Sequence, residues 1–413
     1  MYLIVRRTHF WRHIGFAELS ELYVSRMLRV MAVQMMGGFA IVYLLQLGYP
    51  LHFVALFWFS YFALRVLLSP LVAVTVARYG PKHSTLISNV GQIIAAVFLI
   101  LASNPSFGFV ALLIYMPFAG FSRSLYDVAY LVDFSKIKHV EHAGRELGFM
   151  QIIERAVLAI GPLIGGLIAL LFGAQAMLGF GSFLMLVAAL PLFFTDEPVQ
   201  VRQKITLKHF NWRVAWKPTL ANIATGVDVD LSGIMWAAFL AIVVLGGVNN
   251  NAIYAEIGAL SSISIIVSIV VAYTYGKMVD NHQGKSLLKW SVIGDTVLHM
   301  VRPFVSTPVQ ALGANVANEV VTTGYTMPAT RGIFDTADGL PGYRIIYMTI
   351  MGASLAAGDC ITMLVLALLT SFLPDSSALK GVYFVLAPVI LLILFHTSAV
   401  YRRGILTKFI HRV

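Results

Sequence analysis

The sequence predicts an all-α polytopic membrane protein in which twelve transmembrane helices form two pseudo-symmetric six-helix bundles. Composition is the first of three observations behind this fold class. Of the 413 residues, 59% are hydrophobic and only 12% are charged, and the mean hydropathy is +0.82. A soluble domain is about 45–50% apolar and about 25% charged, because water must wet its surface. Lipid therefore has to solvate most of this chain.

The second observation is a series of apolar runs long enough to cross a bilayer, which takes about 20 residues. Six runs precede the longest polar segment and six follow it: 27–49, 51–76, 84–103, 107–131, 147–172 and 176–195, then 220–246, 254–275, 286–304, 308–331, 344–371 and 380–402. The expected organisation is a cytoplasmic segment (1–26), a first bundle (27–195), a cytoplasmic central loop (196–218), a second bundle (219–402) and a cytoplasmic tail (403–413). In the central loop, Lys208–Trp216 is expected to form an amphipathic helix on the membrane surface.

The third observation is an internal repeat that relates the two halves. Leu47-Gly48 and the loop after the second run recur as Leu245-Gly246 and the loop after the eighth run. Tyr126 in the fourth run corresponds to Tyr325 in the tenth. Two related six-helix halves place a shared pathway at the interface between them.

Basic residues are confined almost entirely to alternate loops. With the N-terminus inside, the loops on the outer side hold only Arg302 and Lys380. Because cytoplasmic loops are enriched in Lys and Arg, both termini are expected in the cytoplasm. The net charge of +10 is spread over these loops and gathers on no single face, so no nucleic-acid partner is expected. The compact loops, which lack a usable N-x-S/T site, favour a bacterial inner membrane.

The two repeated loops carry a signature through which the chain resembles major facilitator superfamily transporters over essentially its whole length. The family signature reads G-x-x-x-D-R/K-x-G-R/K-R/K. The first copy has Ala73 and Ala77 at the glycine and acid positions and keeps the rest as Arg78, Gly80 and Lys82. The second copy is better preserved, at Gly276, Asp280, Gly284 and Lys285. The resemblance implies that these gating loops latch the cytoplasmic side in the outward-facing state.

A second resemblance lies in the fifth run, at Gly161, Pro162, Gly165 and Gly166. Gly161 and Gly165 share one helix face, where a neighbouring helix can approach closely, and Pro162 permits a bend. The motif is similar to one in the fifth span of drug/proton antiporters of this superfamily. That resemblance implies export, whereas plain helix packing is the simpler interpretation.

Charged residues inside the first six runs need a partner or a watery cavity. Arg65 lies near the middle of the second run and is expected to line the cavity and attract an anionic or polar group. Arg123 and Asp127 lie one turn apart in the fourth run, at the depth of Glu154 and Arg155 in the fifth. We expect these four to pair crosswise, Arg123 with Glu154 and Asp127 with Arg155. Such a group is either a structural network or a relay for protons or substrate.

The second half supplies acids for proton exchange. Asp295 and His299 lie one turn apart in the ninth run, and Glu319 and Asp359 lie midway along the tenth and eleventh. A carboxylate in a cavity of low dielectric suits proton exchange at neutral pH, and Glu319 is our first choice, followed by Asp359 and Asp295. Tyr126 and Tyr325 are candidates to line a cavity for an apolar or aromatic substrate.

A membrane-embedded enzyme is the alternative from another class. Asp228-Val229-Asp230 matches the D-x-D pattern of metal-dependent glycosyltransferases, and Asp295 with His299 offers half of a metal site. No third ligand is evident near that pair, and the usual hydrolase and phosphate-binding motifs are missing from the sequence. We therefore expect no enzymatic activity, no metal and no cofactor.

The leading hypothesis is a monomeric secondary active transporter that works by alternating access between the two bundles. Its expected partners are a small-molecule substrate, protons and the lipid bilayer. Proton-coupled efflux of a partly hydrophobic compound is the main expectation. Proton-coupled uptake of a sugar, organic acid or other metabolite, and carriage of an amphipathic lipid, are the alternatives.

Overall fold

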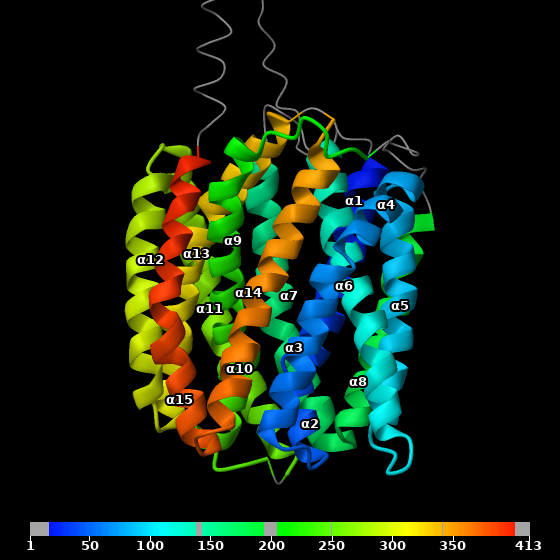
Figure 1. The fold of residues 1–413 in the computed structure, drawn as a ribbon, viewed down its shortest axis with the longest axis vertical. Coiled ribbons are helices and arrows are strands. Elements are labelled where there is room, and N and C mark those ends of the chain that lie inside the picture. The colour runs from blue at the N-terminus through cyan, green and yellow to red at the C-terminus, as the bar shows by residue number, and fades with distance from the viewer. Residues whose placement is uncertain (1–15, 138–142, 194–204, 249, 341, 401–413) are drawn as a thin grey trace, which may run out of the picture.

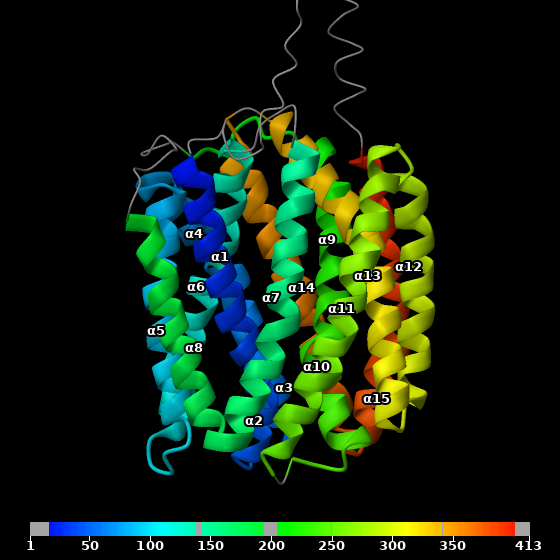
Figure 2. The same ribbon diagram turned by 180° about the vertical axis from the view of Figure 1, so that it is seen from behind.

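The computed structural model describes residues 16–137, 143–193, 205–248, 250–340 and 342–400. Every regular element within these residues is a helix. The helices run along one long axis and form a single layered bundle, which Figures 1 and 2 show from opposite sides. The first and last described helices begin and end at the same end of this bundle, here called the terminal end; the opposite end is the far end.

Consecutive helices combine into six passes through the bundle in the first half. The first two passes are each broken into two helices, and the last ends in a short 3₁₀ turn. Their bounds are α1 (Phe16–Met36) with α2 (Ala40–Gln46), α3 (Leu51–Leu67) with α4 (Ser69–Tyr79), α5 (Pro81–Leu101), α6 (Gly108–Ile137), α7 (Ala143–Phe172), and α8 (Ala174–Ala189) with η2 (Leu190–Phe193).

Six further passes form the second half. Their bounds are α9 (Trp212–Ser232) with α10 (Ile234–Phe239) and η3 (Leu240–Val244), α11 (Ala252–Asp280), α12 (Gly284–Val301) with η4 (Arg302–Phe304), α13 (Pro308–Asp338), α14 (Arg344–Thr370), and α15 (Asp375–Leu386) with η5 (Ala387–Ser398). The predicted fold class, with six helical passes in each half, is therefore confirmed.

Apolar length separates these passes into two groups. Among the described residues, eight helical segments are long and apolar enough to cross a membrane, and the bent pair of α3 and α4, with 48° between its arms, can make a ninth. The other three passes, α7, α12 and α13, lie among them in the bundle. Charged side chains within α12 and α13, such as Asp295 and Glu319, lower the mean hydropathy of these two helices.

One local prediction is wrong. The segment Lys208–Trp216 does not form a separate amphipathic helix: residues 205–211 are turn and irregular structure, and α9 begins at Trp212 and continues into the seventh pass. The aromatic ring of Phe210 packs against those of Trp212 and Tyr343, so the segment is anchored on the second half.

The two halves meet along two pairs of helices, α3 with α14 and α7 with α11. A cluster of buried apolar side chains joins the halves at the terminal end. It brings together residues of α4 and α6 with residues of α13 and α14, among them Val76, Tyr130, Phe334 and Met348.

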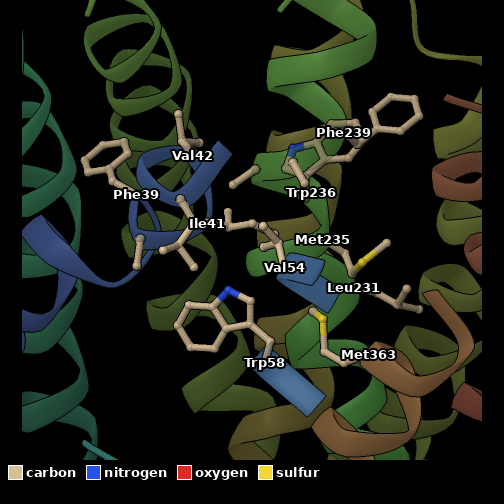
Figure 3. Packing of buried hydrophobic residues seen from close by; sticks show 14 of the residues in the cluster. Phe39, Ile41, Val42, Val54, Trp58, Leu231, Met235, Trp236, Phe239 and Met363 are labelled. Carbon is tan, nitrogen blue, oxygen red and sulfur yellow. The ribbon is translucent and has the colours of Figure 1, made fainter. Parts of the chain in front are cut away.

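A second, larger cluster joins the halves toward the far end. Figure 3 shows Ile41 and Val54 of the first half beside Met235 of the second half, with Trp58 and Trp236 nearby. Hydrogen bonds add to this contact: the hydroxyl of Tyr254 donates to Oε1 of Gln46 at 2.6 Å, and Nδ1 of His52 lies 3.1 Å from the carbonyl oxygen of Ala367. The halves are therefore joined at both ends, with space left between the two clusters.

Candidate functional site: a charged cavity between the halves

A cavity of about 480 Å³ lies between the two halves. Aromatic rings cover much of its wall, contributed by Phe39, Trp58, Tyr61, Phe62, Tyr115 and Trp236. Charged side chains of both signs face it as well, namely Arg65, Arg123, Asp230, Arg302, Glu319 and Asp359. Such a lining can hold a small molecule that has both an apolar body and a charged or polar group.

Arg65 forms the centre of an ion-pair network in this cavity. It comes from α3, and its guanidinium lies 3.3 Å from Asp127 of α6 and 3.3 Å from Asp359 of α14. Asp127 also accepts from Nε of Arg123, one turn earlier in α6, at 3.1 Å. The Arg65–Asp359 pair is buried and joins the first half to the second, whereas the contacts of Asp127 stay within the first half.

Asp127 pairs with Arg65 and Arg123, two contacts that the sequence did not predict, while the expected crosswise pairs with Glu154 and Arg155 stay predictions. Counting how deep each side chain lies in its own helix did not identify Arg65 as a partner of Asp127, because depth alone says nothing about how the helices are rotated. Glu154 and Arg155 belong to α7, and their side chains lie outside the described residues.

Behind the cavity wall of the second half lies a buried cluster of polar side chains. His299 of α12 lies 2.7 Å from Asp228 of α9 and 3.5 Å from Asp295, and the hydroxyl of Tyr325 in α13 donates to Asp228. These four side chains are almost fully buried, and the carboxyl oxygens of Asp295 accept no hydrogen bond within the described residues.

The cluster corrects the expectation that Asp295 and His299 lack a third ligand nearby. Ligand atoms of Asp228, Asp295 and His299 all lie within 4.8 Å of one another, which is close enough to surround a cation. Nδ1 of His299, however, lies 3.4 Å from a guanidinium nitrogen of Arg302. Because a guanidinium only donates, Nδ1 accepts, and the ring proton sits on Nε2 facing Asp228. His299 therefore acts here as a hydrogen-bond donor, and its lone pair is not free for a metal.

Arg302 connects this cluster to the cavity. It follows the last residue of α12, is 1% exposed, and lines the cavity. It contacts the seventh pass at its break: α9 ends at Ser232, Gly233 adopts φ −104° and ψ −95°, and α10 begins at Ile234. Arg302 and the hydroxyl of Tyr383 both donate to the carbonyl oxygen of Leu231, which the break would otherwise leave unsatisfied.

Tyr126 and Tyr325 are not among the residues that line this cavity. The ring of Tyr126 stacks on Tyr130, and the guanidinium of Arg29 lies 3.8 Å from its centroid. Tyr325 belongs to the Asp228 cluster. Both tyrosines are buried in their own half, so they support neighbouring charged groups.

In the first gating loop, Gly80 links α4 to α5 with φ +83°, a conformation that only glycine adopts readily. Arg78 is exposed and lies beside the ring of Tyr79, while Lys82 is buried at the start of α5. The turn therefore needs its glycine, as the signature suggests.

The second gating loop is built differently from its signature. Its left-handed residue is His282, with φ 59°, and not Gly284, which begins α12 in ordinary helical geometry. Asp280 is exposed and lies 3.8 Å from Arg331 of α13. Gly276 meets only ordinary contacts and Lys285 is exposed.

The glycines of the fifth pass allow close approach of two different helices. A methyl group at Gly161 or Gly165 would press on α1, at Gln34 and Met35. One at Gly166 would collide with the carbonyl group of Tyr254 in α11, across the interface between the halves. Pro162, inside α7, lies against Gly258 of α11 in the same contact.

Sequence reasoning overlooked three residues of this site. Asp228 and Asp230 were noted only as a D-x-D tripeptide, although both charges fall inside the apolar run 220–246. Arg302 was assigned to an outer loop, although it lies inside the run 286–304 and one turn after His299. A charge within a predicted span was the signal in each case.

Comparisons with known proteins agree with this architecture. The model of the family described as Major Facilitator Superfamily matches residues 22–294, more than half of the chain. No curated protein matches in sequence.

Several solved structures are similar in fold. A bacterial homologue of the iron transporter ferroportin, in its outward-facing state, is 18% identical, with 92% of this chain and 98% of that chain covered and a TM-score of 0.65. The nucleoside transporter NupG is 14% identical, with 93% and 98% covered and a TM-score of 0.62. The transporter FucP, in the outward conformation, is 12% identical, with 92% and 98% covered and a TM-score of 0.60.

Proposed function

Because the chain belongs to the Major Facilitator Superfamily and is a multi-pass membrane transporter of a small molecule, we propose that it couples transport to protons. The proposed reaction is export of a small, partly hydrophobic compound in exchange for protons, by alternating access of the central cavity to the two sides. Asp359 and Glu319 are the proposed proton acceptors. The protein works as a monomer without a cofactor, in a bacterial inner membrane with both termini in the cytoplasm.

The observation that supports proton coupling is the ion pair of Arg65 with Asp359. It joins the two halves inside the cavity, and Oδ1 of Asp359 has no hydrogen-bond partner within the described residues. A proton on Asp359 would remove its negative charge and leave Arg65 paired with Asp127 in its own half. Proton binding would thereby weaken the contact between α3 and α14, which has to open when the halves rock.

The cavity wall supports a partly hydrophobic substrate. Rings such as those of Trp58, Tyr115 and Trp236 offer flat apolar contact area. The charged groups at the same wall would orient a polar end of the substrate. Export as the direction is inferred from the glycine and proline motif at Gly161–Gly166, through its resemblance to drug/proton antiporters.

The proposal can be tested with purified protein in proteoliposomes that contain a trapped pH dye. Pools of lipophilic cations, antibiotics, sugars and organic acids are added in turn. One pool should produce a pH change whose sign indicates exchange, and Asp359→Asn should abolish it. Asp375→Asn, which changes an exposed acid at the start of α15, serves as the matched control and should leave the response intact.

Two results would contradict the proposal. A pH change of the opposite sign would indicate symport, and the uptake of a polar metabolite would then replace export. That second candidate is favoured by the amides and hydroxyls of the wall, such as Gln34, Gln92 and Ser264. No response to any pool would argue against proton coupling and favour an amphipathic lipid as cargo.

A further inference from the structure

Arg302 is a buried cation that faces the cavity without an acidic partner. Only 1% of its surface is exposed, and no carboxylate of the described residues lies within ion-pair distance of it. Its guanidinium contacts the carbonyl oxygen of Leu231 at 3.4 Å, the hydroxyl of Ser232 at 3.2 Å and the imidazole of His299 at 3.4 Å. Among the described residues, Nε of Arg302 has no hydrogen-bond partner.

A buried charge of this kind is costly unless an opposite charge joins it. The nearest acids behind it are Asp228 and Asp295, and Arg302 reaches them only indirectly, through His299 and Ser232. Asp228 is already occupied by His299 and Tyr325. The missing counter-charge is therefore expected from the cavity side.

Two amides near Arg302 on the cavity side present hydrogen-bond donors. The guanidinium carbon of Arg302 lies 4.6 Å from the centroid of the Trp236 ring. The indole N–H of Trp236, which can only donate, points to the amide oxygen of Asn315. The NH₂ group of Asn315 consequently faces away from Trp236. Ser232 similarly donates to the amide oxygen of Asn318 at 2.9 Å, which leaves the NH₂ group of Asn318 as a donor.

The break in the seventh pass holds this donor group in place. The carbonyl oxygen of Leu231, freed by the break at Gly233, is fixed by Tyr383 at 2.9 Å and by Arg302. Arg302 is thereby positioned at a discontinuous helix next to the substrate cavity, a common location for binding sites in transporters. The planar guanidinium, with its fork of N–H donors, has a geometry that suits a planar anion.

We propose that Arg302 binds the anionic group of the substrate, so that the transported compounds are small organic anions with an apolar or aromatic body. This inference rests on the proposed function of the cavity as the substrate site. Carboxylates, sulfonates and phosphate monoesters share the required chemistry. The body of such a compound lies against Trp58, Tyr61 and Tyr115 on the opposite wall, which belongs to the first half.

Asp230 and Glu319 line the same cavity and favour the opposite charge, so the test must separate anions from cations. Binding to the purified full-length protein in detergent is measured by calorimetry with probes that share one ring. The anions are benzoate, p-toluenesulfonate and phenyl phosphate; benzamide is the neutral probe, and benzyltrimethylammonium is the cation.

At least one anion should bind the wild-type protein more tightly than benzamide, and the cation should bind more weakly than benzamide. Arg302→Gln should weaken the binding of that anion by about tenfold or more, since a hydrogen bond to a charged group is lost. The affinity for benzamide should stay unchanged. Arg302→Lys should recover part of the affinity. Arg213→Gln, which removes an exposed cation at the start of α9, is the matched control and should bind like wild type.

Preference of the wild-type protein for the cation, or binding of no anion, would overturn the inference, and neither result depends on a variant that has to fold. Equal affinity of wild type and a folded Arg302→Gln variant would overturn it as well. Proton coupling is judged separately by the pH dye in proteoliposomes. Anion binding without proton movement would refute the proposed proton coupling and support the anion site at Arg302. Proton movement driven by the cation would support proton coupling and refute the anion site.

Discussion

Replacing Asp359 with asparagine should let α3 and α14 separate, and the single cysteine of the chain can report the separation. Cys360 follows Asp359 in α14, is half-buried, and its Sγ lies 3.9 Å from the carbonyl oxygen of Phe59 in α3. Separation of α14 from α3 would uncover the rest of this side chain, so the thiol should react faster with N-ethylmaleimide when the two helices part. The labelling rate therefore measures how often the two helices part.

The expected magnitude follows from the contacts of Arg65. Removing one partner of a buried ion pair costs about 3–5 kcal/mol when the other charge is left alone. Arg65 keeps Asp127 at 3.3 Å after the substitution, so only its charged hydrogen bond to Asp359 is lost, about 1.5–3 kcal/mol. A loss of about 2 kcal/mol shifts the equilibrium between joined and separated helices roughly 30-fold.

Cys360 in the Asp359→Asn variant should thus react roughly 30-fold faster than in wild type. Removal of a neighbouring negative charge also favours the thiolate, so Arg65→Gln is needed as a second variant. It breaks the same bridge but removes a positive charge, and it should accelerate labelling too. Acceleration in Asp359→Asn alone would be an electrostatic effect on the thiol and would refute the bridge as a latch, as would a wild-type rate in both variants.

Three further substitutions test other parts of the structure. Glu319→Gln should abolish substrate-driven proton movement in proteoliposomes without changing thermal unfolding, because Glu319 lines the cavity; an unchanged rate would remove it from the mechanism. Gly258→Ala should lower the free energy of unfolding by about 1–3 kcal/mol, because its methyl group would collide with the carbonyl of Pro162. Gly179→Ala places its methyl group in open space and should leave the free energy of unfolding unchanged. Equal effects of the two substitutions in thermal unfolding would contradict the close packing at Gly258. Gly80→Ala should lower the free energy of unfolding by about 1–3 kcal/mol, because alanine is strained at the φ of +83° that this position adopts. A melting temperature equal to that of Gly179→Ala would show that the loop relaxes freely.

Hydropathy placed most of the passes, because a helix that crosses a bilayer must be apolar over a fixed length, whereas α7, α12 and α13 are not among the described segments that meet this criterion. It also marked Arg65, Glu319 and Asp359 as costly charges, and all three face the cavity. The partner of Arg65 was beyond sequence reasoning. Asp359 lies nearly 300 positions away in the other half, and only the packing of α3 on α14 brings the two together.

Helix rotation explains the remaining errors. A sequence gives the depth of a side chain in a span but not the direction in which the helix turns it. Tyr126 and Tyr325 lie at matching depths, yet both are turned into their own half. Asp228 and Arg302 lie in different spans, and their proximity to His299 depends on how α9 and α12 are rotated against each other.

The close contact of Gly166 in α7 with Tyr254 in α11 is the point about which we expect the two halves to rotate. Gly166 is six residues from the far end of α7 and 23 residues from its other end, about 9 Å and about 35 Å along the helix. Backbone touches backbone there, so we expect a rotation of the halves to pivot near this point. The same small angle then displaces the terminal end of α7 about four times as far as the far end. We therefore expect the proposed rocking of the halves to open the cavity more widely at the terminal end than at the far end.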